Sequence, residues 1–465
     1  MKRIAIIGGG ISGVAAAYQL AQTGVDFNLF EASPRLGGIV ETCHRDGFVI
    51  ECGPDSWVTE KPWARELAIE LGLEAEIIPS NDSWRRTYLL EDKRLIPMPD
   101  GMRMMVPTRW APILNSPLFS WQARLAFLRE FREADNLKRS ALPEGEDESV
   151  ASFVRRHFGD EVTRTIAGPL LAGVFGGSVE ELSVRAVMPA FVKLEREHGS
   201  LIAAFQRRHN GNSGSVFTSL TTGLETLIER MAAKLPSNAI CLNHEVLSLM
   251  RDSGRWCITA PGFSGSFDAL ILSTPAHITR RLLSPLNSEF SQLLNMDATS
   301  AIVIALAFSA DRARHLRIPR GFGYLVPQRP SHIAPDTEPQ LLASTFVNQK
   351  FTHRAPEGAV LLRAFFGGDT APALLGSSDS NLITLALKRL SQALGPLPDP
   401  DIALVRRWPH SLPQYAVGHL DRIAKLSDLV GGFPGLHLVG NAYHGVGLPD
   451  LIREGREAAR HAAQI

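Results

Sequence analysis

Glycines near the N-terminus have a spacing that can hold a dinucleotide. Gly8, Gly10 and Gly13 follow an apolar run, Ile4–Ile7, and precede a stretch of small residues typical of a helix. The first glycine would allow a sharp turn, the second would let backbone amides approach a pyrophosphate, and the third would let helix and strand lie close together. Glu31 stands 18 residues after Gly13, where a carboxylate can meet ribose hydroxyls.

These residues imply a strand, a tight turn, a helix and a second strand within residues 1–40. The positive end of the helix and its unpaired N–H groups would face the phosphates. A secretory signal peptide is the alternative interpretation, because Lys2 and Arg3 precede an apolar stretch that reaches Ala15–Ala17. The regular glycine spacing and the polar continuation at Gln19 favour the nucleotide-binding unit.

Two further glycine segments indicate which dinucleotide is bound. Arg35-Leu36-Gly37-Gly38 and Ile39 come shortly after Glu31, and Gly53-Pro54-Asp55-Ser56 follows the apolar run Phe48–Cys52. A nicotinamide dinucleotide would not need backbone contact at these additional points, whereas FAD in an extended conformation would. The sequence therefore predicts FAD.

The C-terminal segment has a matching pattern. An apolar run ends at Gly440, a glycine-rich loop continues to Gly447, and Pro449 suits the first turn of a final helix. The positive end of that helix would stabilise the negative charge of a reduced flavin. The alternative is a loop that only caps the helix. We expect the two ends of the chain to complete one domain, with other domains inserted between them.

The composition is that of an ordinary globular protein, with 465 residues of which 45% are hydrophobic and 21% are charged. Lys plus Arg and Asp plus Glu both number 48, so no basic excess points to nucleic acid. The four cysteines have no metal-ligand spacing, which predicts reduced thiols, no metal centre and a cytoplasmic location. No apolar run reaches the ~20 residues of a membrane span.

Local patterns predict further elements. Residues 63–71 have a helical pattern that ends at Gly72, as a helix would. A hairpin is expected at 244–250 and 256–260, and further strands are expected at 269–273, 301–308 and 360–366.

Residues 100–175 are predicted to be mostly helical and carry many apolar side chains between prolines. Arg103, Arg109 and Arg124 are interspersed among them. Such a segment could dock on the cytoplasmic face of a membrane, or it could simply pack on the rest of the protein. Both interpretations stay open, as does a homodimer.

Taken together, the motifs resemble the FAD-dependent protoporphyrinogen oxidases of heme biosynthesis, a family within the flavin amine-oxidase-like superfamily. The resemblance spans the whole chain, with the motifs in the family order. Its most specific parts are LPQYAVGH at 412–419 and GNAYHGVGLPD at 440–450. Less specific are GGGISG, RLGG, GPDSW and FTSLTTGLETL.

The resemblance implies an α/β fold with a Rossmann-like FAD-binding domain, an inserted α+β substrate domain and a helical, membrane-facing domain. We expect the FAD-binding domain to be discontinuous, in residues 1–60, 215–280 and 400–465. The substrate domain is expected in residues 61–90, 176–214 and 281–399, and the helical domain in residues 91–175.

The resemblance also assigns cofactor contacts. Val246 would hold the adenine through its backbone, Trp408 would lie against the cofactor, and Val446–Leu448 would cover the flavin. The full set comprises Gly8, Gly9, Gly10, Ile11, Ser12, Gly13, Glu31, Arg35, Gly37, Gly38, Ile39, Gly53, Pro54, Asp55, Ser56, Val246, Trp408, Gly440, Val446, Gly447 and Leu448.

For the tetrapyrrole substrate, the resemblance implies contacts with four residues of the inserted domain, namely Phe322, Gly323, Leu325 and Phe365. Their apolar surfaces would suit its rings, although ordinary core packing is the alternative. Mitochondrial members of the family place a propionate-binding arginine before a Leu-Pro turn. The matching position here is Thr87, so Arg86 or its neighbour Arg85 could supply the cation, with other cations of the chain as the alternative.

The implied reaction is oxidation of protoporphyrinogen IX to protoporphyrin IX. A hydride would pass from a bridge carbon to the flavin in three two-electron cycles, with no catalytic acid or base. Dioxygen is the expected acceptor and a quinone the alternative, and His410 and His444 are interpreted as structural. The rival hypotheses are coproporphyrinogen III as substrate, an amine oxidase or polyene desaturase on the same scaffold, and a flavin-free carrier of hydrophobic ligands.

Overall fold

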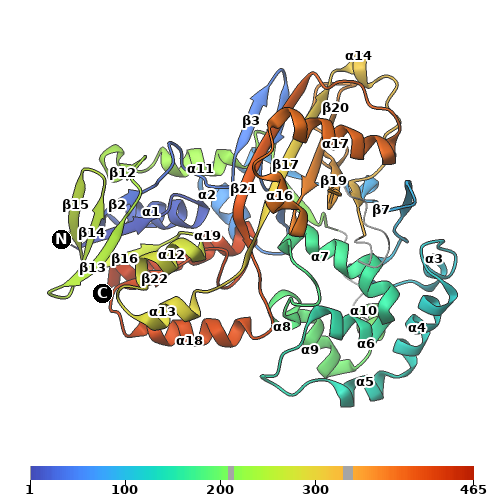
Figure 1. The fold of residues 1–465 in the computed structure, drawn as a ribbon, viewed down its shortest axis with the longest axis horizontal. Helices are drawn as coiled ribbons and strands as arrows, with labels where there is room; N and C mark the ends of the chain where they lie inside the picture. The colour runs from blue at the N-terminus through green and yellow to red at the C-terminus, as the bar shows by residue number, and fades with distance from the viewer. Residues whose placement is uncertain (1, 208–213, 328–338, 465) are drawn as a thin grey trace.

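The computed structural model describes residues 2–207, 214–327 and 339–464. Figure 1 shows a lobe that contains both ends of the chain, a second lobe built on a large sheet, and a group of helices below that sheet. The predicted substrate domain includes residues 208–213 and 328–338, which lie outside the described residues.

The first lobe is organised around a parallel sheet in the order β12-β2-β1-β16-β22. β1 (Arg3–Ile7) lies at its centre, and its apolar residues are almost fully buried because both faces of the sheet are covered. The other strands come from the start, middle and end of the chain: β2 (Asp26–Phe30), β12 (Ile240–Cys241), β16 (Ala269–Leu272) and β22 (Leu436–Leu438). The two ends of the chain therefore share one sheet, as expected.

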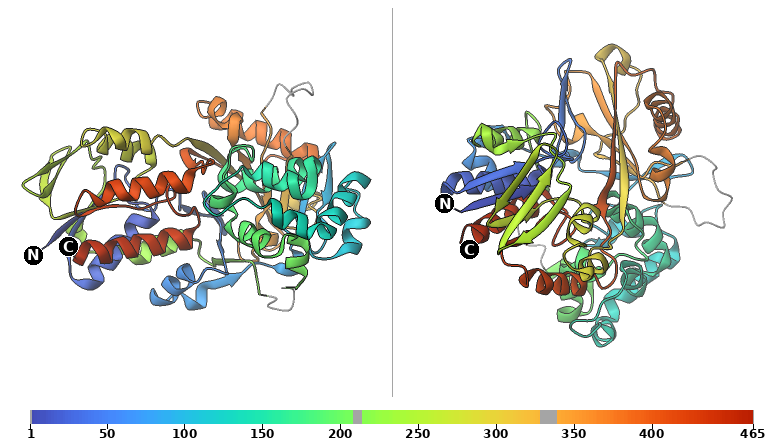
Figure 2. Two further views of the ribbon diagram at one scale, coloured as in Figure 1. Left: turned by 90° about the horizontal axis from the view of Figure 1, so that it is seen from below. Right: turned by 60° about the vertical axis from the view of Figure 1, so that its left-hand side comes forward.

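Helices α1 (Ile11–Thr23) and α19 (Leu448–Gln464) lie side by side against this sheet, as Figure 2 shows from below. Gly455 permits the contact, because a Cβ there would lie 2.2 Å from the carbonyl oxygen of Ser12. The packed side of α19 consists of small and apolar residues that are all buried: Leu451, Ile452, Gly455, Ala458, Ala459 and Ala462.

The remaining elements of this lobe form layers on the two faces of the sheet. The layer of α1 also holds α11 (Glu225–Ala232) and α2 (Trp63–Glu70). A helix was predicted at α2, but residues 61–90 were expected in the substrate domain, whereas the apolar side chains of α2 pack in the core of this lobe. The opposite layer contains α12 (Ala276–Leu283), α13 (Ser288–Leu293), α18 (His419–Gly431) and a small antiparallel sheet of β13 (Ser248–Asp252), β14 (Arg255–Ala260) and β15 (Phe263–Phe267).

The predicted strand at 244–250 begins only at Ser248, so Val246 lies in irregular chain and not in a strand. Asn243 has a positive φ of 57°, and the amide of His244 donates to the carbonyl of Glu31 at 2.9 Å. The chain therefore turns and bonds to the loop after β2 before the hairpin starts. The hairpin itself, from β13 to β14, is confirmed.

The second lobe is a seven-stranded sheet in the order β21-β17-β20-β19-β18-β7-β8, antiparallel except between β18 and β7. The predicted strands at 301–308 and 360–366 lie within it. Its members are β7 (Thr87–Glu91), β8 (Arg94–Pro97), β17 (Ala298–Phe308), β18 (Gly323–Leu325), β19 (Ala343–Phe346), β20 (Val360–Phe366) and β21 (Ile402–Pro413). Helices α16 (Ala371–Leu374) and α17 (Asp379–Leu394) pack on one face.

Two strands of this sheet differ from the expected domain division. β21 falls in the range 400–465 expected for FAD binding, and β8 falls in the helical range 91–175. Both belong to the large sheet because their ladder partners, β17 and β7, lie there. Helix α14 (Ala310–Ala313) follows β17 and packs in the second lobe. The remaining short elements are β3 (Thr42–Arg45), β4 (Phe48–Glu51), β5 (Trp57–Val58), β6 (Ile77–Pro79), β11 (Phe217–Leu220) and α15 (Val347–Lys350).

The helical region has its own apolar core, in which Phe127, Phe153 and Phe158 are fully buried. It begins with a short hairpin, β9 (Met102–Arg103) and β10 (Val106–Pro107), where helix was predicted. Its helices are α3 (Trp110–Leu114), α4 (Trp121–Arg132), α5 (Ala134–Ser140), α6 (Val150–Val162), α7 (Gly168–Phe175), α8 (Val184–Val187), α9 (Pro189–His198) and α10 (Leu201–Arg207). The last three were expected in the substrate domain, but their apolar side chains complete this helical core.

The apolar side chains of residues 100–175 have two different environments. Met105, Ile113 and Phe119 are buried in the helical core, whereas Trp121 and Leu125 on α4 are 67% and 50% exposed. None of the described helices is long and apolar enough to cross a membrane. Contact with a membrane surface stays a prediction.

Candidate functional site

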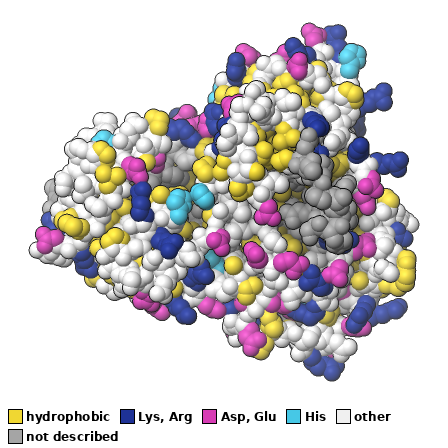
Figure 3. Space-filling view, viewed as in Figure 1, with side chains coloured by type: hydrophobic (Ala, Val, Ile, Leu, Met, Phe, Trp, Pro, Cys, Tyr) yellow, Lys and Arg dark blue, Asp and Glu magenta, His cyan; other side chains and the backbone are white. Residues whose placement is uncertain are grey.

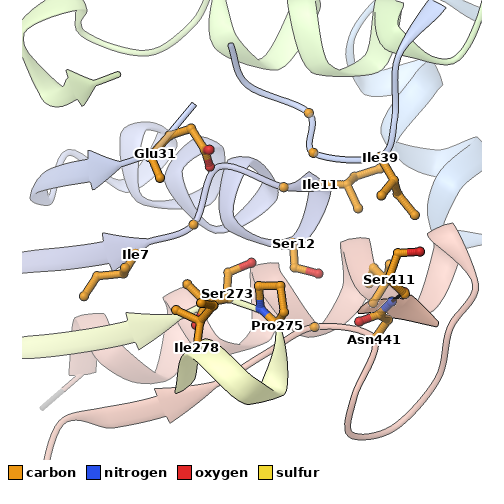
Figure 4. Close-up of a pocket in the computed structure, with 18 of the residues that line it drawn as sticks. Ile7, Ile11, Ser12, Glu31, Ile39, Ser273, Pro275, Ile278, Ser411 and Asn441 are labelled. Atoms are coloured by element: carbon orange, nitrogen blue, oxygen red, sulfur yellow. Dashed lines mark hydrogen bonds between the residues drawn. The ribbon is translucent and has the colours of Figure 1, made fainter. Parts of the chain in front are cut away.

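A cavity of about 470 Å³ lies at the carboxyl edge of the parallel sheet. Its walls come from the loops that follow β1, β2, β16 and β22 and from the end of β21, which belongs to the other lobe. Figure 4 shows Glu31 at one end of the cavity and Ile39 and Asn441 at the other, with Ser12 and Ser273 between them. Ligands of open α/β sheets bind at this edge.

The first turn of α1 presents backbone amides to the cavity. Gly10 is the N-cap and supplies no side-chain bond, and the first turn contains no acidic residue. A Cβ built on Gly10 would meet nothing within 4 Å, and Gly10, Ile11 and Ser12 all line the cavity. An uncapped helix N-terminus of this kind attracts an anion such as a diphosphate.

Backbone amides hold Glu31 at one end of the cavity, beside the turn after β1. One carboxylate oxygen accepts from the amide of Gly9 at 2.6 Å and the other from the amide of Ser33 at 2.8 Å. Figure 4 shows the carboxylate directed toward the turn after β1. Its position at the end of β2 is where the ribose hydroxyls of a dinucleotide would donate hydrogen bonds to it.

The Cys52–Ser56 segment forms part of the wall between the two lobes. Pro54 and Ser56 line the cavity, and Gly53 is required because a Cβ there would lie 1.8 Å from the carbonyl oxygen of Ile39. Three backbone carbonyls of the segment accept bonds from other elements: Cys52 from the Trp408 indole N–H at 2.8 Å, Gly53 from Arg363, and Asp55 from the Ser219 hydroxyl at 2.8 Å. The segment is therefore fixed from outside.

The Asp55 carboxylate does not line the cavity as expected. It lies 2.8 Å from Lys350 Nζ and 3.3 Å from Arg363 Nη1, both in the second lobe. Burial alone would raise the pKa of Asp55, but the two cations outweigh burial and hold the pKa well below its usual range. Ion pairing between the lobes thus replaces the expected contact with the cofactor.

The loop between β22 and α19 is fixed by Tyr415. The Tyr415 hydroxyl donates to the carbonyl of Asn441 at 2.7 Å and accepts from the amide of Gly445 at 2.9 Å. The Asn441 amide donates to the carbonyl of Ser411 at 2.8 Å. These bonds hold Val446–Leu448 in the cavity wall.

The structure brings most of the predicted cofactor residues together around this cavity. Those that line it are Gly8, Gly10, Ile11, Ser12, Glu31, Gly37, Gly38, Ile39, Pro54, Ser56, Val246, Trp408, Gly440, Val446, Gly447 and Leu448. Gly9, Gly13, Arg35 and Gly53 lie behind the wall. Gly13, for example, lies against β1, where a Cβ would come 1.9 Å from the carbonyl oxygen of Gly8.

A group of wall residues was not predicted from the sequence, because no glycine motif marks them. Ser273, Thr274 and Pro275 follow β16, and Ile278 and Arg281 come from α12. They enter the site because β16 pairs with β1, which only the strand order could have indicated. The others are Ile7, Phe30, Ala32, His244, Glu245, Leu282, Pro409, His410, Ser411, Asn441 and Leu451.

The predicted substrate residues do not line this cavity, but three of them share one face of the seven-stranded sheet. Leu325 pairs with Ala343, which pairs with Phe365, so their side chains form one row. Gly323 occupies the next row on that face, together with Arg363. The Arg363 guanidinium bonds to the Cys52–Ser56 segment, so this face is directed toward the cavity lobe.

The other two candidates, Phe322 and Arg86, lie just before strands β18 and β7 of the same sheet. The amide of Phe322 donates to the carbonyl of Arg86 at 2.8 Å, and Thr87 pairs with Gly323. Phe322 is buried and Arg86 is exposed. The backbone of the candidate cation therefore lies beside that of Phe322.

Comparisons with known proteins agree with this architecture. The model of the family described as flavin containing amine oxidoreductase matches residues 11–463. A coproporphyrinogen III oxidase of Bacillus subtilis is 33% identical over 99% of this chain and 98% of its own length. Protoporphyrinogen oxidase 1, chloroplastic, of Arabidopsis thaliana is 29% identical over 98% of this chain and 86% of its own length.

Solved structures share the fold. A crystal structure from Exiguobacterium sp. 255-15, which carries a provisional protoporphyrinogen oxidase name, has a TM-score of 0.84 at 30% identity and covers 100% of this chain and 99% of its own. Putrescine oxidase has a TM-score of 0.70 at 17% identity, with the same coverage, which shows the fold alone.

The fold and the cavity define an FAD-dependent oxidoreductase. The open space at Gly10, the uncapped α1 N-terminus and Glu31 beside the turn before it fit the diphosphate and ribose of FAD. The chain belongs to the flavin-containing amine oxidoreductase family.

Proposed function

We propose that this protein is a porphyrinogen oxidase of heme biosynthesis. The single observation that carries the proposal is the shared sheet face of Leu325, Gly323 and Phe365, beside the wall of the FAD cavity. A porphyrinogen is broad and largely apolar with carboxylates at its edge, so such a face suits its rings. The names of relatives that match nearly the whole chain support the same reaction class.

FAD, when bound, supplies the hydride acceptor for oxidation of a bridge carbon. The chain's own residues provide position and environment. Gly10–Ser12 would hold the diphosphate, Glu31 the ribose, and Ile39, Pro54, Trp408 and Val446–Leu448 would border the flavin end. Phe365 and Leu325 would orient the macrocycle, and exposed Arg86 would pair with a propionate. We expect no acid or base from the chain.

Between the two substrates, coproporphyrinogen III is the first choice. The relatives with 33% and 31% identity, from Bacillus subtilis and Propionibacterium freudenreichii, are both coproporphyrinogen III oxidases, which supports this order. Protoporphyrinogen IX, implied by the family resemblance, is the alternative. We propose dioxygen as acceptor, with a quinone as the alternative.

The test is a steady-state assay with the two porphyrinogens and putrescine offered separately to the FAD-loaded enzyme. We expect porphyrin fluorescence from both porphyrinogens, with kcat/KM for coproporphyrinogen III about tenfold higher, a difference of about 1.4 kcal/mol. Heat-denatured enzyme gives the rate of oxidation by air alone. Porphyrinogen oxidation no faster than this background, with turnover of putrescine, would overturn the proposal.

A further inference from the structure

We propose that five buried charged side chains next to the Cys52–Ser56 segment form an electrostatic site that raises the reduction potential of the bound flavin. The five, which we call the interlobe charge cluster, are Glu51, Asp55, Lys350, Arg354 and Arg363. The inference rests on the proposed function in one respect, namely that the flavin ring lies at the Trp408 end of the cavity.

The cluster joins two parts of the chain with a strict division of charge. Both carboxylates, Glu51 and Asp55, come from the end of β4 and the segment after it, and all three cations come from α15, β20 and the chain between them. Arg354 lies 3.0 Å from Glu51, and Lys350 and Arg363 lie 2.8 and 3.3 Å from Asp55.

The cluster reaches the cavity wall through the Cys52–Ser56 segment. Arg363 donates to the carbonyl of Gly53, and Lys350 Nζ lies 3.0 Å from the hydroxyl of Ser56, which itself lines the cavity. Arg354 donates at 2.6 Å to the Ser219 hydroxyl, which holds the carbonyl of Asp55. Lys350 is therefore one contact away from the cavity wall, and Arg363 bonds to the residue before Pro54, which lines the cavity.

Three cations against two carboxylates leave one positive charge in excess. The side chains of Glu51, Arg354 and Arg363 are at most 2% exposed, so water screens this charge poorly. Arg363 Nε and Arg354 Nε and Nη1 are buried without a hydrogen-bond partner in the described structure. The unpaired groups of the cluster are thus cationic. A positive charge stabilises a reduced, negatively charged flavin.

The titration directions agree with this geometry. Burial disfavours the negative charge of Glu51 and raises its pKa, although Arg354 acts in the opposite direction. The pKa of Asp55, by contrast, is lowered by its two cations, so this carboxylate stays ionised. Any protonation of the cluster would begin at Glu51 and would increase the positive excess. Glu41 and Arg406 also lie near this segment, but they pair with each other at 2.6 Å.

A cluster that only holds the two parts of the molecule together would have the same contacts. The test must therefore distinguish an effect of charge on the flavin from an effect on stability. Asp55→Asn removes a negative charge with little change in shape, and Lys350→Met removes a positive one. We expect the midpoint potential of the bound FAD, measured by dye-coupled anaerobic titration, to rise in D55N and to fall in K350M. The double variant D55N/K350M and the charge-conserving K350R should stay near the wild-type potential.

Opposite shifts of the midpoint potential support the inference. Loss of a purely structural contact would not shift the potential in a direction that depends on the charge removed. Shifts in the same direction, or no shift in D55N, would overturn it. D55N alone is decisive if K350M does not retain FAD. The same preparations are assayed with both porphyrinogens: potentials that shift as expected without porphyrinogen oxidation would contradict only the proposed function, and the converse result would contradict only the cluster.

Discussion

At the scale of single residues, the glycines of the first turn have distinct physical roles. Gly10 faces the open cavity, whereas Gly13 lies against the backbone of Gly8, 1.9 Å from where its Cβ would be. The spacing alone predicted both roles, because a turn, a helix start and a strand–helix contact are local geometry. The ion pairs of Asp55 could not be predicted in this way, because its partners Lys350 and Arg363 are some 300 residues away in the sequence.

The two glycines should respond differently to the same substitution. Gly10→Ala should fold normally but weaken FAD binding by about tenfold, or about 1.4 kcal/mol, because the methyl group enters the space of the diphosphate. Gly13→Ala should lower the free energy of unfolding by about 1–3 kcal/mol through overpacking. Urea unfolding of the apo-protein and fluorescence titration with FAD measure the two effects. A G10A variant that binds FAD like the wild type would contradict our placement of the diphosphate.

At the scale of elements, the helical region is joined by a buried ionic contact that no motif indicated. His157 on α6 lies 3.2 Å from Glu130 on α4 and 3.0 Å from Glu195 on α9, all buried. Burial alone would lower the pKa of His157, but the bonds and charges of the two carboxylates outweigh it and raise the pKa above its ordinary value. The sequence predicted helices here, but which faces meet depends on tertiary packing.

This contact predicts a pH dependence of stability. A histidine with a raised pKa stabilises the folded state fully below its unfolded pKa of about 6.5, and the contribution is lost as pH rises through the folded pKa. The free energy of unfolding should therefore fall as pH rises from about 6.5 upward. His157→Gln should destabilise by about 3 kcal/mol at pH 6 and flatten this dependence.

His198→Gln is the matched control, because His198 ends α9 in a partly exposed position beside Glu197. It should cost less than about 0.5 kcal/mol. Urea titrations from pH 6 to pH 9 measure both variants. An H157Q protein that keeps the pH dependence of the wild type would show that another group causes it.

At the scale of the whole molecule, the site depends on segments from all parts of the chain. The ends of the chain could be predicted to share one unit, because both carry strand, glycine loop and helix patterns. The domain limits could not, since β21 reads as a strand in either lobe and only its pairing with β17 assigns it to the large sheet. Trp408 on β21 nevertheless reaches the cavity and bonds to the Cys52–Ser56 segment.

This interleaving of chain segments places a sheet face that suits a macrocycle next to a dinucleotide cavity. The surface of the helical region carries scattered charges of both signs (Figure 3). The central claim is that the two are coupled: a porphyrinogen on the sheet face reduces the FAD in the cavity. Activity in air does not isolate this step, because dioxygen also oxidises porphyrinogens directly.

The most direct measurement is anaerobic rapid mixing of the FAD-loaded enzyme with coproporphyrinogen III or protoporphyrinogen IX. We predict loss of the visible absorbance of oxidised FAD at a rate that rises with porphyrinogen concentration and saturates. The absorbance should return when dioxygen is admitted. Oxidised FAD that keeps its absorbance with both porphyrinogens, but loses it with an amine such as putrescine, would contradict the account.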